Sequence, residues 1–250
     1  MTIRITPITG IPSVQPGDDL AALLSSAFDY NALRLTTGDI VVVCQKVVSK
    51  AEGRIARLSE VTASPFAHQL AAQTAGKDPR IIEVILRETN RIVRMDRGHL
   101  IVETGPGWVC ANAGVDESNS LGPDIVILLP TDPDASAARL RAALRKRTGA
   151  TVAVLITDTF GRPWREGLVD FALGLAGMEA QLDLRGQHDL SGRELHHTVM
   201  AQADALAAAA GLAMRKGDGI PAVLVRGYQF ASVDGNAKSL IRAREFDLFR

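Results

Sequence analysis

The stretch from Val152 to Arg165 holds residue types from which a catalytic site could be built. Residues 152–156 have the β-branched, apolar composition of a buried strand, and they lead into Thr157-Asp158-Thr159. A carboxylate flanked by hydroxyls can bind a hard divalent cation, and the guanidinium groups of Arg162 and Arg165 can bind phosphate or carboxylate. This combination favours phosphoryl chemistry. A capped turn with both arginines on the surface would give the same pattern.

A second acidic residue, Asp116, also follows a strand-like segment. Residues 99–104 and 108–112 flank Gly105-Pro106-Gly107 and predict a β-hairpin whose second strand leads toward Asp116 and Asn119. A turn in which Asp116 and Asn119 form local hydrogen bonds explains the pattern equally well. If the strands before Asp116 and Asp158 approach each other, the two carboxylates can belong to one site.

Two other segments offer basic side chains for an anionic ligand. The expected strand 39–49 contains Gln45-Lys46 and is followed by Lys50. A buried lysine is costly unless it is paired, so Lys46 either extends to the surface from an edge strand or meets a fixed anion. Residues 215–221, rich in glycine and charge, precede the strand 222–226 and could contact a nucleotide or form an ordinary turn. The sequence has no Walker A motif and no Gly-x-Gly-x-x-Gly motif, so a nucleotide site needs another design.

Composition limits the class of protein. The chain has 250 residues with 28 basic and 28 acidic side chains, which gives no reason to expect nucleic acid or an anionic membrane as partner. The N-terminal stretch lacks the apolar segment of a signal peptide, and the apolar runs are too short for a membrane span. We therefore expect a cytoplasmic protein. Cys44 and Cys110 lie in strand-like segments without metal-ligand spacing and are expected to be buried, inert thiols.

Several helices are expected around these strands. Ser64-Pro65 and Asp78-Pro79 each begin a helix, and Asp134 or Ser136 caps another that ends at Gly149. Residues 167–178 predict a helix whose small side chains allow another backbone to pack closely. A capping box at 191–194 predicts a long helix to about residue 214, which would contain a histidine pair that cannot easily share one metal.

Taken together, six segments resemble the coenzyme F420-0:L-glutamate ligases, a family that includes the N-terminal domain of actinobacterial two-domain enzymes. They occur in the family's order and span most of the chain. The segments are Gly10-Ile11-Pro12, Val47 to Arg54, Asn112 to Asn119, Ile156 to Arg162, Gly192-Arg193-Glu194-Leu195 and Gly217 to Val223.

The resemblance implies a GTP- and metal-dependent ligase that adds L-glutamate to F420-0, or to its dehydro form, and continues with γ-linked additions. GTP would first phosphorylate the acceptor carboxylate, and the amine of glutamate would then attack the acyl phosphate. Asp116 and Asp158 would hold Mg²⁺ or Mn²⁺, Thr159 would reach a second ion, and the resemblance allows K⁺ as well. The residues expected to line GTP are Ile11, Pro12, Ser13, Val14, Gln45, Lys46, Lys50, Asn119, Met214, Arg215, Lys216, Gly217, Asp218, Gly219, Ile220 and Pro221. The expected catalytic residues are Asp116, Asp158 and Arg162. Arg165 is a further candidate for binding phosphate or the carboxylates of glutamate.

The chain also departs from the family pattern. Archaeal members tend to carry Ser-Thr in place of Gln45-Lys46 and an acidic residue in place of Arg215-Lys216, so the resemblance does not transfer all protein ligands of the second ion. A flavin-dependent reductase domain follows in actinobacterial relatives but has no counterpart here, so another protein would reduce a dehydro precursor.

The expected fold is α+β, with mixed or antiparallel sheets and packed helices, in a homodimer. One ligase domain is expected over residues 1–250, with weak internal boundaries near 130–135 and 182–192 that would allow two closely packed subdomains. Three other functions stay open: a related ligase with a different phosphate-bearing acid, a phosphoryl or nucleotidyl transferase, and a GTP-binding sensor without turnover.

Overall fold

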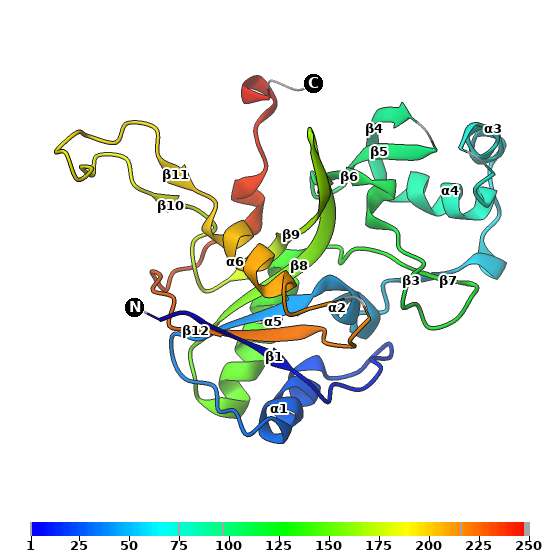
Figure 1. The fold of residues 1–250 in the computed structure, drawn as a ribbon. Coiled ribbons are helices and arrows are strands. Elements are labelled where there is room, and N and C mark those ends of the chain that lie inside the picture. Colours follow the sequence, from blue (N-terminus) through cyan, green and yellow to red (C-terminus); the bar gives the residue numbers. More distant parts are fainter. Residues whose placement is uncertain (1, 75, 97, 216, 248–250) are drawn as a thin grey trace.

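The main sheet of the protein is mixed, and two of its inner strands are parallel, so that they end at the same end of the sheet. The computed structural model describes residues 2–74, 76–96, 98–215 and 217–247. The five-stranded sheet has the order β1-β12-β2-β8-β9, in which only the β2–β8 pair is parallel (Figure 1). Both parallel strands therefore end on the same side of the sheet. The strands are β1 (Arg4–Ile8), β2 (Ile40–Cys44), β8 (Ala153–Arg162), β9 (Arg165–Ala176) and β12 (Ala222–Arg226).

Both faces of this sheet are covered by apolar clusters. Along β2, Val41 and Val43 belong to one cluster, whereas Ile40 and Val42 belong to the other, as the alternation of side chains along a strand requires. The first face is covered by α1 (Leu20–Tyr30), α2 (Gln45–Ala51) and α5 (Pro133–Thr148), and the second by α6 (Gln202–Gly211) and the C-terminal segment.

A smaller lobe lies beside the sheet and has its own apolar cluster (Figure 1). Ser64 and Asp78 cap two of its helices with Pro at the first positions, and the expected hairpin around residue 105 is present, so these predictions are confirmed. The elements of the lobe are β3 (Ile55–Arg57), the 3₁₀ helix η1 (Leu58–Glu60), α3 (Pro65–Gln73), α4 (Pro79–Arg87), β4 (Thr89–Asp96), β5 (His99–Thr104), β6 (Val109–Ala111), the 3₁₀ helix η2 (Asn112–Gly114) and β7 (Ile125–Ile127).

A hairpin arm and the C-terminal segment complete the chain. The arm, residues 180–201, extends away from the body and contains the short pair β10 (Leu182–Asp183) and β11 (Val199–Met200) (Figure 1). The C-terminal segment, residues 227–247, carries the 3₁₀ helices η3 (Ala237–Leu240) and η4 (Arg244–Phe246). Within the described part of the chain, no helix is long and apolar enough to cross a bilayer.

Two expected helices were wrong. Residues 167–178 lie mostly in β9, because pairing with β8 and burial between neighbouring elements outweigh the helical preference of a Leu- and Ala-rich stretch. The expected helix 191–214 begins only at Gln202, and the capping-box residues lie in the arm, where His188 pairs with Glu194. The close approach expected from small residues does occur: a Cβ on Gly174 would lie 2.3 Å from the carbonyl oxygen of Pro133.

Two element boundaries also needed correction. The expected strand 39–49 ends at Cys44, and Gln45 begins α2, so Lys46 is not on an edge strand. The cap of α5 is Asp132, whose side chain accepts a hydrogen bond from the N–H of Ala135, rather than Asp134 or Ser136.

Candidate active site

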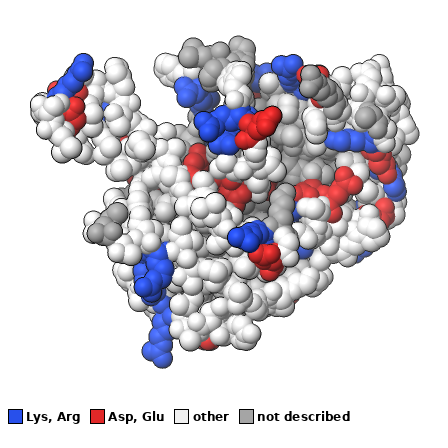
Figure 2. Space-filling view, viewed as in Figure 1, with Lys and Arg blue, Asp and Glu red and all other residues white. Residues whose placement is uncertain are grey.

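A cleft of about 1200 Å³ lies where β2 and β8 end. Its lining comes from segments far apart in the sequence: the N-terminal loop, α2, the chain after β6, the β8–β9 hairpin, the start of β12 and the C-terminal segment. On the face shown in Figure 2, acidic side chains gather near the middle of the molecule, below the tip of the β8–β9 hairpin. Asp116 and Asp158, the two acidic residues expected from the sequence to follow strands, both line this cleft.

Asp158 is a carboxylate in β8 without an ion-pair partner among the described residues. Its pKa is raised to about 7, mainly by burial and also by the negative charges of Asp116 and Asp170, although the N–H of Thr159 and the charge of Lys46 act in the opposite direction. A carboxylate held in this way gains from a nearby positive charge. The side chain lies in the wall of the cleft, where a ligand can supply that charge.

Asp116 has a different environment in the same cleft. Its backbone forms a bridge with Ile127, and its carboxylate forms an ion pair of 2.7 Å with Lys46. Lys46 Nζ also donates 2.6 Å to the Ser118 hydroxyl. Burial alone would raise the pKa of Asp116, but hydrogen bonds from Lys46 and Ser118 hold it below its usual value. The alternative in which Lys46 meets a fixed anion is therefore confirmed.

Two further carboxylates enter the cleft from β9 and α6. Thr159 and Asp170 are cross-strand partners, and the Thr159 hydroxyl donates 2.7 Å to Asp170 Oδ1. Asp204 accepts a hydrogen bond of 3.0 Å from the N–H of Ala172, and burial raises its pKa. Sequence reasoning missed both residues because they lay inside segments expected to be scaffold helices.

Several cations in the cleft have no carboxylate partner among the described residues. Lys50 is buried, and both burial and the charge of Lys46 lower its pKa. Arg162 donates one hydrogen bond to the carbonyl of Glu166, while its buried Nε has no partner in the described part of the chain. Arg215 and Arg242 line the cleft as well. These side chains suit an anionic ligand.

The structure brings together most of the expected site residues. The expected residues that line the cleft are Ile11, Pro12, Ser13, Val14, Lys46, Lys50, Asp116, Asn119, Asp158, Thr159, Arg162, Met214, Arg215, Gly219, Ile220 and Pro221. Gly217, Asp218 and Arg165 do not line it, and Lys216 lies outside the described residues. Gln45 is fully buried and accepts a hydrogen bond from Ser49, so its side chain is not part of the lining.

The donor set fits a divalent cation. No three His, Cys, Asp or Glu side chains of the described residues form a ready ligand cluster. The half-buried carboxylate of Asp158, the nearby Asp116 and the Thr159 hydroxyl are nevertheless hard oxygen donors of the type that Mg²⁺ and Mn²⁺ accept together with water or phosphate. Cys44 and Cys110 are poor ligands because burial raises their pKa values to about 11 and about 12.

The fold and cleft define an α+β protein in which half-buried carboxylates and cations without an ion-pair partner among the described residues face a common binding space. The family model described as F420-0:Gamma-glutamyl ligase matches residues 9–227. The chain is 46% identical to the coenzyme F420:L-glutamate ligase of Methanothermobacter thermautotrophicus, over 100% of both chains. It is 48% identical to that of Methanopyrus kandleri and 43% identical to that of Archaeoglobus fulgidus, over 100% of this chain and 98% and 97% of the relatives. The protein belongs to the F420-0:gamma-glutamyl ligase family, which confirms the resemblance seen in the sequence.

Proposed function

We propose that this protein ligates L-glutamate to F420-0, using GTP and a divalent cation. The observation that carries the proposal is the combination of end-to-end similarity to coenzyme F420:L-glutamate ligases with an Asp158 carboxylate in the large cleft that has a raised pKa and no ion-pair partner among the described residues. Addition of further γ-linked glutamates belongs to the same proposal, because each product again ends in a carboxylate.

The proposed reaction has two chemical steps. A carboxylate oxygen of the acceptor attacks the γ-phosphorus of GTP, the bond to GDP breaks, and an acyl phosphate forms. The amine of glutamate then attacks the acyl carbon, and the amide bond forms as phosphate leaves. Both steps concentrate negative charge, so positioning and electrostatic stabilisation dominate catalysis.

The side chains have separate roles in this proposal. Asp116, Asp158 and Thr159 hold the cation, which neutralises phosphate charge when bound. Lys50 and the residues 11–14 hold the nucleotide, with Arg215 at its phosphates. Arg162 orients the phosphate or carboxylate group that approaches the reacting centre.

The test is to incubate the purified protein with F420-0, L-glutamate, GTP and Mg²⁺ or Mn²⁺, and to follow products by mass spectrometry. Stepwise mass increases of one glutamate residue, with one GTP hydrolysed for each, are expected. Omission of GTP, glutamate or metal should each abolish the increase. No increase under any metal condition would contradict the proposal.

The same experiment separates the alternatives. A phosphoryl or nucleotidyl transferase would consume GTP without glutamate, and a sensor would bind GTP without consuming it. The cleft favours none of these over ligation, since its free cations and carboxylates can serve a second, anionic substrate beside the nucleotide.

We also propose that the protein is a homodimer. The arm carries exposed apolar side chains that a second copy could cover: Leu182, Leu190, Val199 and Met200. Light scattering coupled to gel filtration should give twice the chain mass of 26.7 kDa, and a monomer at assay concentration would contradict this.

A further inference from the structure

The C-terminal segment forms one wall of the cleft, although it lies beyond the residues matched by the family model. That match ends at residue 227, whereas Leu240, Ile241 and Arg242 line the cavity. Figure 1 shows the C-terminal segment beside the β8–β9 hairpin. Its 3₁₀ helix η3 contacts β9. The wall also reaches the smaller lobe: a Cβ on Gly107 would lie 3.3 Å from the Ile241 side chain.

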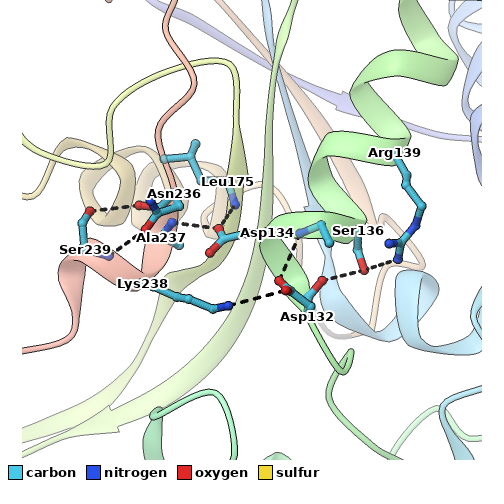
Figure 3. Close-up of polar contacts among 10 residues, drawn as sticks. Asp132, Asp134, Ser136, Arg139, Leu175, Asn236, Ala237, Lys238 and Ser239 are labelled. Carbon is cyan, nitrogen blue, oxygen red and sulfur yellow. Dashed lines mark hydrogen bonds and ion pairs between the residues drawn. The ribbon is translucent and has the colours of Figure 1, made fainter.

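The start of α5 fixes this wall in place. Asp134 Oδ1 accepts hydrogen bonds from the N–H groups of Leu175 in β9 and Ala237 in η3, at 2.9 and 2.8 Å (Figure 3). Ala237 is fully buried, and Asn236 caps η3 through the N–H of Ser239. One carboxylate thus joins the sheet, α5 and the segment that carries Arg242.

The C-terminal wall lies apart from Ile11 and Val14, two of the residues expected to hold GTP. Leu240 and Trp108 pack against the cluster on one face of the sheet, whereas Ile11 and Val14 belong with the cluster on the other face. The apolar lining near the β8–β9 hairpin includes Phe160 and Phe171, whose rings are stacked with their centroids 6.0 Å apart. Aromatic and aliphatic surfaces of this type suit a planar ring system.

Arg242 provides the charge of this wall. It lines the cleft, is exposed, and has no ion-pair or hydrogen-bond partner among the described residues. A guanidinium can bind a phosphate with two parallel hydrogen bonds, so a free arginine beside an apolar wall suits a ligand that joins a flat ring to an anionic linker.

We propose that the C-terminal wall is the subsite for the acceptor, with Arg242 binding its phosphate and Trp108, Leu240 and Ile241 contacting its aromatic ring. This inference rests on the proposed function, since F420-0 is the aromatic, phosphate-bearing substrate. Asp134 is a positioning residue that acts through the segment. The subsite would leave the acceptor carboxylate directed toward Asp116 and Asp158, while the nucleotide occupies the opposite wall.

The test compares Arg242→Ala with Arg244→Ala, a matched control because Arg244 lies on the same segment but does not line the cleft. Calorimetric titration with F420-0 in the presence of a non-hydrolysable GTP analogue measures acceptor affinity, and titration with the analogue alone measures nucleotide affinity. Loss of a charge-assisted contact should weaken F420-0 binding at least about tenfold in Arg242→Ala. Nucleotide affinity and the Arg244→Ala variant should be unchanged, and Arg242→Lys should recover part of the affinity.

A second pair of variants tests the positioning role of Asp134. Asp134→Ala should raise the KM for F420-0 more than it changes the KM for GTP. Asp134→Asn should restore the KM for F420-0, because Oδ1 can still accept both N–H groups.

Equal F420-0 affinity in wild type and Arg242→Ala would overturn the proposed acceptor subsite. If wild type itself neither binds nor extends F420-0, the proposed function fails, which is a different result.

Discussion

Asp116 and Asp158 line one cleft, but among the described residues Asp116 forms an ion pair and Asp158 does not. Lys46 lies 2.7 Å from Asp116 and, with Ser118, keeps the pKa of that carboxyl low, whereas burial raises the pKa of Asp158 to about 7. The lysines divide in the same way: Lys46 is paired, and Lys50 has no ion-pair partner within the described ranges. In the metal-free protein the Lys46–Asp116 pair stabilises the site, whereas Asp158 and Lys50 lack an ion-pair partner among the described residues and should respond most strongly to a bound ligand.

The largest effect is expected from removing the unpaired carboxylate. Asp158→Asn keeps the size and shape of the side chain but removes a negative ligand of the cation, so kcat/KM for ligation should fall by about 1000-fold. Asp96→Asn, which changes an exposed aspartate outside the cleft, is the control and should keep wild-type activity. Full activity of Asp158→Asn would place the cation elsewhere.

The same two aspartates should have opposite effects on the stability of the metal-free protein. Ionising Asp158 is unfavourable in the fold, so stability declines as pH rises from its unfolded pKa of about 3.8 to its folded pKa of about 7. Above pH 7, Asp158→Asn should therefore increase the free energy of unfolding by roughly 1 to 3 kcal/mol.

Asp116→Asn should instead decrease the free energy of unfolding at pH 7 by roughly 1 to 3 kcal/mol, because it leaves Lys46 without its partner. The lowered pKa of Asp116 means that this stabilisation is present at neutral pH and is lost as pH falls through the folded pKa. Urea denaturation in chelator at several pH values measures both variants. Changes of the same sign would remove the distinction between paired and unpaired carboxylates.

Lys50 provides a test of the unpaired cations. Lys50→Met should weaken GTP binding by about tenfold, since a partly desolvated ammonium facing phosphate is lost. Lys77→Met is the matched control, because burial also lowers the pKa of Lys77 but its amine donates to Asn112 and does not line the cleft. Equal GTP affinity in Lys50→Met and wild type, measured by calorimetry, would argue against a nucleotide at this wall.

The smallest difference concerns the two arginines at the hairpin tip. Arg162 lines the cleft and Arg165 does not. Arg162→Ala should raise the KM of one anionic substrate by about tenfold, and Arg165→Ala should change it by less than about twofold. Similar losses in both variants would place the substrate over the outside of the hairpin.

The sequence was most informative where local chemistry and long-range packing agree. The apolar run before Asp158 is a strand, and the caps at Ser64 and Asp78 begin helices as expected. The arm and β9 could not be predicted, because a local capping box and a run of small residues indicated helices, whereas pairing with distant strands decides the structure. The sequence predicted the strand before Asp116 and the strand before Asp158 separately. It did not predict that the two aspartates share a cleft, because this depends on how the smaller lobe packs against the sheet.

The residues missed in the site share one property, which is that no local motif marks them. Asp170 is placed by its pairing with Thr159, and Asp204 by a hydrogen bond to β9. Arg242 lines the cleft on a segment whose 3₁₀ helix η3 is joined to α5 by a hydrogen bond to Asp134. An acidic residue inside a small-residue stretch, as at Asp170, is the one sequence signal that could have pointed to the site.

The most direct test of the difference between the two aspartates is Mn²⁺ binding followed by electron paramagnetic resonance in the presence of GTP. Wild-type protein should bind Mn²⁺, and Asp158→Asn should weaken that binding at least about tenfold, with Asp96→Asn as control. An unchanged bound fraction in Asp158→Asn would contradict the assignment of its unpaired carboxylate to the cation.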